Sequence, residues 1–116
     1  MFVCSLDGSY WREKFMKSID VLMVRIYITE KSHLLNTIID YLKKQIKIRG
    51  ISVFRAIGGF GETGNHTSSL IDLSLDLPIA IEFFDDDKNK IEEALDHLNS
   101  IVKPEHIVMW EAKANI

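Results

Sequence analysis

Closely spaced glycines lie in the middle of the 116-residue sequence and could bind a phosphate group through their backbone amides. Gly59, Gly61 and Gly64 form a G-x-G-x-x-G pattern, which His66 and Thr67 follow. In dinucleotide-binding proteins such glycines stand directly between a strand and a helix, so that the pyrophosphate meets the helix N-terminus. The histidine could instead act as an acid, a base or a metal ligand, because its pKa lies near neutrality. The helices and strands predicted on either side of the glycines distinguish between these chemistries.

Before the glycines, the sequence predicts a strand, a helix and a second strand. Residues 20–29 are predicted to form the first strand, because apolar residues alternate there: Leu22, Val24, Ile26 and Ile28. Residues 32–49 are predicted to form a helix, because apolar residues recur at helical spacing: Leu35, Ile38, Ile39, Leu42 and Ile46. Gly50 is placed to end this helix. Residues 51–57 form the second predicted strand, which leads into the glycines.

After the glycines, the sequence predicts a third strand with strict alternation. Its apolar positions are Leu73, Leu75, Leu77, Ile79, Ile81 and Phe83. Pro78 cannot donate a backbone hydrogen bond, so the strand should be bulged or lie at a sheet edge there.

A second helix and a last strand complete the predicted elements. The carboxylates of residues 85–87 suit the start of a helix. Its apolar stripe comprises Ile91, Ala94, Leu95, Leu98, Ile101 and Val102. Pro104 should stop the helix, and residues 106–112 form the last predicted strand.

This order predicts an α+β fold, a ferredoxin-like βαββαβ sandwich. The four-stranded antiparallel sheet would carry both helices on one face. Residues 20–116 would form this single domain, and residues 1–19 would be an N-terminal extension, which could be disordered. The glycines would lie in a loop at the tip of the second and third strands.

This context argues against a phosphate loop and against RNA binding. No helix begins at Gly64, and no Gly-Lys-Ser/Thr follows, so neither the dinucleotide nor the Walker arrangement fits. The formal charge of −3 and the pI near 5.8 leave no basic surface for nucleic acid. Tyr27 and Phe83 are more simply core or sheet-surface residues than stacking partners for bases.

Side-chain chemistry near the loop is open to several interpretations. His66 has no metal-ligand partners at suitable spacing, so loop organisation or ligand contact is favoured over catalysis. The aspartates at 85–87 are better explained by helix capping than by a metal. Arg55 could pair with Glu62, with Glu82 or with an anionic ligand. Trp110 is expected to pack in the core or at a subunit contact.

Composition excludes further classes. Cys4 is the only cysteine, which excludes an internal disulfide and a thiolate zinc cage. The longest apolar runs fall short of the about 20 residues that a membrane span needs, and no signal-peptide core is present. We therefore expect a cytoplasmic protein with no membrane insertion.

Two stretches of the sequence resemble a known family. "GISVFRAIGGFG" (50–61) and "HTSSLIDLSLDLPIAIEFFDD" (66–86) are similar to the domain-of-unknown-function 190 family, a PII-like group of small proteins. The similarity extends over residues 21–112. It implies a homotrimer of ferredoxin-like protomers, in which the long loop contacts a partner protein. Small ligands would bind in the clefts between subunits, at the base of that loop.

The resemblance also implies the residues of the ligand site. Carried onto this sequence, they are Arg55, Gly58, Gly59, Phe60, Gly61, His66 and Thr67. One departure is important, because the second glycine-and-lysine loop of nucleotide-binding PII proteins has no counterpart here. The loop tyrosine that PII proteins modify is also absent from residues 58–70. ATP is therefore not implied, and the ligand remains unnamed.

The function expected from sequence is regulatory rather than catalytic. A trimer would bind a small metabolite or nucleotide and signal through residues 58–70, and Ala80 and Phe84 on the uncovered sheet face would be buried by trimerisation. Two alternatives remain. One is an enzyme that uses His66 in an intersubunit cleft, and the other is a structural adaptor without a ligand.

Overall fold

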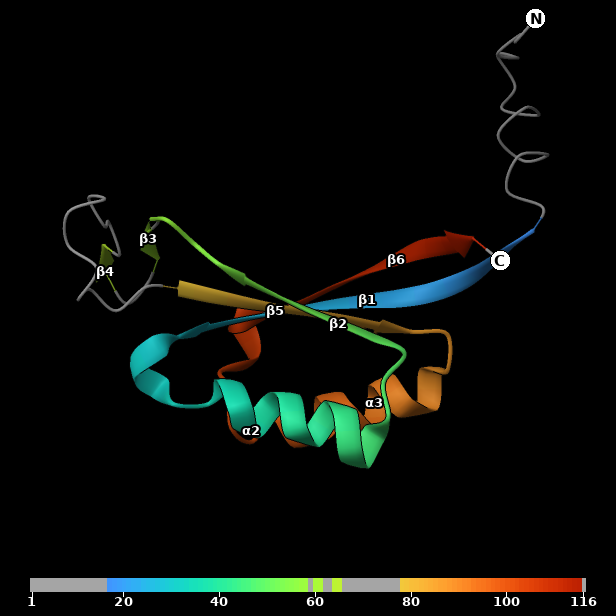
Figure 1. The fold of residues 1–116 in the computed structure, drawn as a ribbon, viewed down its shortest axis with the longest axis horizontal. Coiled ribbons are helices and arrows are strands. Elements are labelled where there is room, and N and C mark those ends of the chain that lie inside the picture. Colours follow the sequence, from blue (N-terminus) through green and yellow to red (C-terminus); the bar gives the residue numbers. More distant parts are fainter. Residues whose placement is uncertain (1–16, 59, 62–63, 66–77, 116) are drawn as a thin grey trace, which may run out of the picture.

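A twisted antiparallel sheet with two helical segments on one side forms the body of the protein (Figure 1). The computed structural model describes residues 17–58, 60–61, 64–65 and 78–115. The strands of the sheet are β1 (Ser18–Thr29), β2 (Gly50–Arg55), β5 (Pro78–Asp85) and β6 (Ile107–Asn115). They lie in the order β2-β5-β1-β6, with every neighbouring pair antiparallel. This is the ferredoxin-like arrangement, and the predicted fold class is confirmed.

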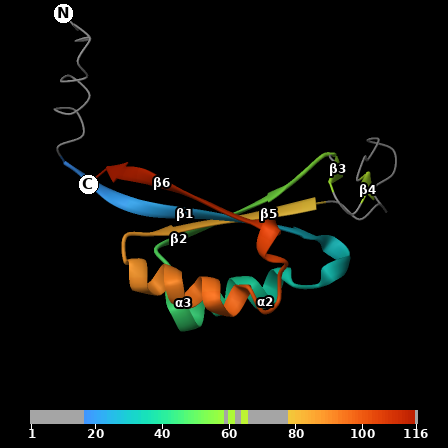
Figure 2. The ribbon, with the colours of Figure 1, turned by 180° about the vertical axis from the view of Figure 1, so that it is seen from behind.

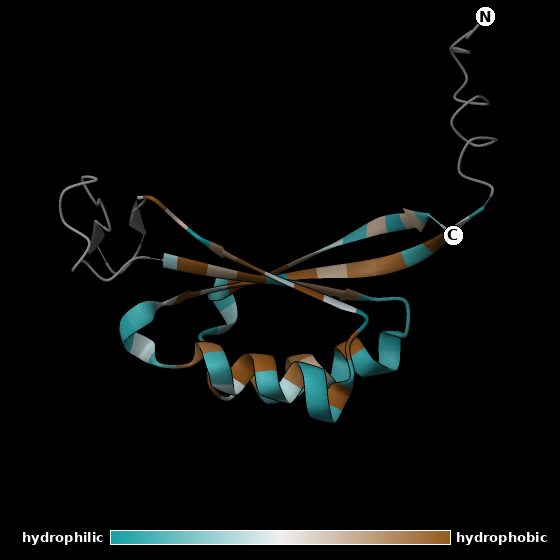
Figure 3. Ribbon diagram, in the orientation of Figure 1, coloured by the Kyte–Doolittle hydropathy of each residue, from teal (hydrophilic) through white to brown (hydrophobic). Residues whose placement is uncertain are grey.

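The core lies between the sheet and the helices. Seen from behind, both helical segments again cover the same side of the sheet (Figure 2). The alternating residues of β1 and β5 face them, and Val24, Ile26, Ile81 and Phe83 are fully buried. Apolar positions of the helices turn toward the same layer (Figure 3). The alternating apolar residues of the sequence therefore form the helix-covered face of the sheet.

The first helix is shorter than its prediction, residues 32–49, at both ends, because Ser32 belongs to a preceding 3-10 turn and the helix ends at Ile46. It begins as α2 (Leu35–Asp40) and continues as the π-helix η2 (Tyr41–Ile46). Its buried residues are Ile38, Leu42 and Ile46, which belong to the predicted stripe. Lys47 ends the helix in the left-handed conformation, with φ of 60°.

The prediction that Gly50 ends the helix is wrong. Gly50 is the first residue of β2 and lies opposite Phe84 of β5. A Cβ atom at this position would lie 2.5 Å from the Phe84 ring. The glycine is needed here because the aromatic ring packs directly over the backbone.

The second helix, α3 (Lys88–Leu98), begins as predicted but ends earlier. Asp87 is its N-cap, and its carboxylate accepts a 3.0 Å hydrogen bond from the Asn89 amide. The helix ends at Leu98, six residues before Pro104, so the prediction that the proline stops it is wrong. Val102 lies beyond the helix but is still buried in the core. Pro104 instead starts the short 3-10 turn η3 (Pro104–His106).

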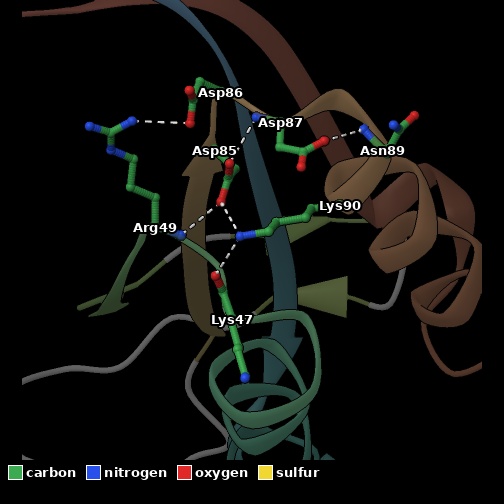
Figure 4. A network of polar contacts seen from close by, with 7 residues as sticks. All are labelled: Lys47, Arg49, Asp85, Asp86, Asp87, Asn89 and Lys90. Carbon is green, nitrogen blue, oxygen red and sulfur yellow. Dashed lines mark hydrogen bonds and ion pairs between the residues drawn. The ribbon is translucent and has the colours of Figure 1, made fainter.

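A buried carboxylate joins the two helical segments through the end of β5 (Figure 4). Asp85 is only 3% exposed and accepts hydrogen bonds from the amides of Arg49 (3.0 Å) and Asp87 (2.8 Å). Lys90 Nζ lies 3.9 Å from its Oδ2 and donates to the Lys47 carbonyl at 3.2 Å. The carboxylate thus fixes the start of α3 against the end of the preceding helix. The capping interpretation is confirmed for Asp87.

Pro78 is the first residue of β5 in the described part of the chain. β5 has neighbours on both sides, so placing Pro78 on an edge strand is wrong. Its carbonyl accepts a 2.9 Å hydrogen bond from the Ala56 amide, and the pairing with β1 runs without a break up to Thr29. A proline is tolerated at a strand's first residue. The predicted strand residues 73–77 lie outside the described residues.

The connection from β2 to β5 includes a short pair of strands beyond the sheet end (Figure 1). β3 (Phe60–Gly61) and β4 (Gly64–Asn65) pair with each other only. At the other end of the chain, residues 1–16 of the expected extension lie outside the described residues, whereas Ser18 and Ile19 already belong to β1. No helix in the described ranges has the length and apolar character that crossing a membrane requires.

Candidate functional site

Arg55 is the last residue of β2, and its register fixes the side of the sheet on which it lies. It pairs across the strands with Ile79, which is buried under the helices, so Arg55 lies on the helix-covered side. Its guanidinium forms an ion pair with Glu30, which begins the 3-10 turn η1 (Glu30–Ser32) after β1. The suggested pairing with Glu82 is wrong, because Glu82 binds Arg25. The alternative partner Glu62 lies outside the described residues.

A hollow of about 280 Å³ opens beside this ion pair. It is lined by Glu30, His33, Leu35, Asn36, Arg55 and Ile79. The set combines a cation, an anion, an imidazole and an amide with two apolar side chains. The hollow therefore offers charged groups of both signs beside two apolar side chains.

The turn after β1 brings the polar lining residues to the end of β2. The Ser32 hydroxyl donates a 2.6 Å hydrogen bond to the Thr29 carbonyl. His33 follows with φ of 57°, and its amide donates to the Glu30 carbonyl at 3.2 Å. This left-handed conformation is uncommon for a residue with a side chain. It reverses the chain between the strand and α2, which positions Asn36 beside Arg55.

The predicted ligand residues are only partly described by the structure. Phe60 pairs with Asn65 and Gly61 with Gly64 in the small β3-β4 ladder, and Gly58 lies in the bend that leads to it. The remaining predicted residues Gly59, His66 and Thr67 lie outside the described residues. Among the predicted residues that the structure describes, Arg55 alone lines the hollow.

The open face of the sheet, opposite the helices, is a second surface of interest. Its exposed apolar and aromatic residues come from three strands: Tyr27, Phe54, Val108 and Trp110. Tyr27 lies directly opposite Ala80, which lies opposite Phe54, so these residues form one row across the sheet. Trp110 is therefore on the surface and not in the core, whereas Phe83 is a core residue.

An ion pair lies at the centre of this open face. Arg25 donates to Glu82 through Nη2 at 2.6 Å and through Nε at 3.0 Å. The guanidinium carbon is 5.2 Å from the centre of the Trp110 ring, a cation–π distance. Hydrogen bonds to Tyr27 and then to Glu82 raise the pKa of Arg25. The open face thus surrounds a satisfied charge pair with apolar surface.

Metal chemistry finds no support among the residues that the structure describes. No three His, Cys, Asp or Glu side chains in these ranges are grouped so that they could hold a metal ion. His97 packs against Tyr41 with ring centres 4.1 Å apart, and neither residue lines the hollow.

Sequence reasoning missed Glu30, His33 and Asn36 as site residues. The only signal was a polar run between the first strand and the first helix, residues 29–33. It also missed the Arg25–Glu82 pair, because cross-strand partners depend on the register. Both sets come together only through contacts between distant parts of the chain.

Comparison with solved structures supports the same fold. CPII, a nitrogen regulatory PII-like protein from Thiomonas intermedia K12 bound to ADP, AMP and bicarbonate, aligns with a TM-score of 0.69 at 13% identity. The alignment covers 87% of this chain and 93% of that one. A PII-like signalling protein from Thermus thermophilus aligns with a TM-score of 0.59 at 14% identity, over 87% and 93% of the two chains.

The family is established by the sequence itself. The pattern of the DUF190 family, described as "Uncharacterized ACR", matches residues 21–114. This range contains the whole sheet from Val21, both helices and the hollow. The chain belongs to the domain-of-unknown-function 190 family.

Proposed function

We propose that the chain is a cytoplasmic, non-enzymatic PII-like regulatory protein that works as a homotrimer. It binds a small metabolite or nucleotide in the clefts between subunits and signals to a partner protein through residues 58–70. The ligand contacts come from Arg55, Gly58, Phe60 and Gly61, together with Gly59, His66 and Thr67. Binding shifts the population of conformations of this segment and requires no covalent chemistry.

The observation that carries this proposal is the open face of the sheet. Tyr27 is 41% exposed, Phe54 54% and Val108 45%. Large exposed apolar patches rimmed by polar groups mark interaction surfaces. Since the Arg25–Glu82 pair is already satisfied within one chain, a second copy can cover this face without leaving a buried charge unpaired.

The position of the glycine-rich segment supports a signalling role. It joins two neighbouring strands, β2 and β5, whose last described ladder contact is the Ala56–Pro78 hydrogen bond. A loop held by a rigid sheet is a favourable place for binding. The ligand class follows CPII, which is bound to ADP, AMP and bicarbonate.

Native mass spectrometry of the purified protein tests this proposal, first alone and then with ADP, AMP or bicarbonate. We expect a trimer that gains the mass of one of these ligands. Trp110→Glu serves as the control, because it places a charge on the open face and should yield the monomer without bound ligand. A wild-type protein that stays monomeric under all conditions would contradict the assembly, and a trimer that gains none of the three masses would contradict the ligand class.

A further inference from the structure

The hollow beside Arg55 is distinct from the surface that the proposed trimer buries. Arg55 and Ile79 share the helix-covered side of the sheet. Tyr27, Phe54 and Trp110 lie on the other side. Arg55 is shared with the proposed intersubunit ligand contacts, whereas the other residues that line the hollow are not among them.

The size of the hollow selects a small ligand. Its volume of about 280 Å³ corresponds to about nine water molecules at about 30 Å³ each. Pockets for drug-sized molecules occupy about 300–1,000 Å³. A small metabolite of a few carbon atoms fits within this volume.

The charges of the hollow select a ligand that carries both signs. A simple anion that approaches Arg55 also meets the Glu30 carboxylate, and a simple cation that approaches Glu30 meets the guanidinium. A zwitterion satisfies both groups at once. We propose that this hollow binds a free α-amino acid, with its carboxylate on Arg55 and its ammonium group on Glu30.

The remaining lining residues fit the same ligand. The planar guanidinium has five N–H donors and can hold a carboxylate through two parallel hydrogen bonds. The Asn36 amide offers both a donor and an acceptor to the polar end. Leu35 and Ile79 provide an apolar surface for an aliphatic side chain.

The existing Arg55–Glu30 pair does not prevent binding. The two side chains are 62% and 33% exposed, so the pair is a surface ion pair that contributes little to folding. When an amino acid binds, the direct Arg55–Glu30 contact is replaced by two contacts to the ligand, one from its carboxylate to Arg55 and one from its ammonium group to Glu30. Each charge therefore still has a partner of opposite sign. Because Arg55 immediately precedes the 56–77 connection, occupation of the hollow acts at the point where that segment begins.

Isothermal titration calorimetry with L-leucine, N-acetyl-L-leucine and L-leucinamide tests the charge requirement. The acetylated form lacks the ammonium charge and the amide form lacks the carboxylate. We expect L-leucine to bind and each blocked form to bind about tenfold or more weakly. Absence of L-leucine binding would overturn the proposal, and equal binding of N-acetyl-L-leucine would assign the hollow to simple anions instead.

Matched variants test the location. Arg55→Met and Glu30→Gln should each weaken L-leucine binding about tenfold or more. Arg49→Met is the control, since Arg49 forms a comparable exposed ion pair with Asp86 (3.0 Å) outside the hollow. Unchanged binding by Arg55→Met that is still folded by circular dichroism would overturn the assignment. Trp110→Glu should bind L-leucine as the wild type does, because the hollow lies on the side of the sheet opposite Trp110, although it shares Arg55 with the proposed intersubunit contacts.

Discussion

The two faces of the sheet are built from the same strands and serve different purposes. In β5, Phe83 is fully buried under the helices, whereas its neighbour Phe84 is only partly buried on the open face. At its buried centre, the covered face consists of aliphatic and phenylalanine side chains. The open face mixes aromatic residues with the Arg25–Glu82 ion pair. The covered face therefore stabilises the single chain, and the open face is available to a second copy.

The largest change in stability is expected when an aromatic residue of the covered face is replaced by alanine, compared with the same replacement on the open face. Phe83→Ala leaves a cavity in the core and should lower the free energy of unfolding by about 3–5 kcal/mol. Phe54→Ala, on the open face, should lower it by less than about 1 kcal/mol in dilute protein, because its side chain is already 54% exposed. Denaturant titration measures both. Equal losses would show that the open face also supports the fold of the single chain.

The carboxylates of Asp85 and Glu82, both in β5, allow the covered and open faces to be compared through charged residues. Asp85→Ala removes the acceptor of two backbone amides on the covered side and should cost about 2–4 kcal/mol. Glu82→Ala removes a partly exposed ion pair on the open face and should cost about 1 kcal/mol or less. Thermal unfolding at matched, low concentration distinguishes them. A larger loss for Glu82→Ala would contradict the assignment of the two faces.

The C-terminal end of the first helix, at Lys47, offers a way to make the protein more stable. Lys47 adopts a left-handed conformation that glycine adopts without steric cost, so Lys47→Gly should raise the free energy of unfolding by about 0.5–1 kcal/mol. The Lys90 hydrogen bond to its carbonyl is a backbone contact and is retained. Lys44→Gly, within η2, is the control and should cost about 1 kcal/mol. A loss of stability in both variants would contradict the capping role of residue 47.

The smallest effect concerns the pH dependence of an exposed carboxylate. A hydrogen bond from its own backbone amide, then the Arg49 side chain, lowers the pKa of Asp86. A depressed pKa in the folded state gives stability that is complete above the unfolded value of about 3.9 and is lost as the pH falls through the folded pKa. Asp86→Asn should therefore lower the unfolding midpoint at about pH 7 and have a smaller effect at about pH 2. A midpoint shift of the same size at both pH values would show that the charge is not responsible.

The sequence was sufficient to predict the element order, because alternation and helical spacing report directly on burial. It located the buried residues of β1, α2 and β5 for the same reason. It failed at the helix ends, where Lys47 adopts the conformation expected of glycine and α3 stops before Pro104. The first of these ends is held by contacts from distant residues, since Lys90 donates to the Lys47 carbonyl and Asp85 accepts from the Arg49 amide.

Of the residues that line the hollow, the sequence predicted Arg55 as a site residue. Its position in the second strand identified it, but the side of the sheet on which it lies required the register with Ile79. Glu30 and Asn36 reach it through the turn at His33, which no local pattern indicates. A site formed by separate elements is invisible to motifs within one of them.

Sedimentation equilibrium of the wild type beside Trp110→Glu tests the central claim most directly. We expect the wild type to sediment at three times the 13.3 kDa chain mass, and Trp110→Glu at the mass of one chain with an unchanged unfolding midpoint at low concentration. That result would show that the covered face stabilises the single chain and that the open face forms the contacts between subunits. A wild type of single-chain mass, or a Trp110→Glu variant that remains a trimer, would contradict it.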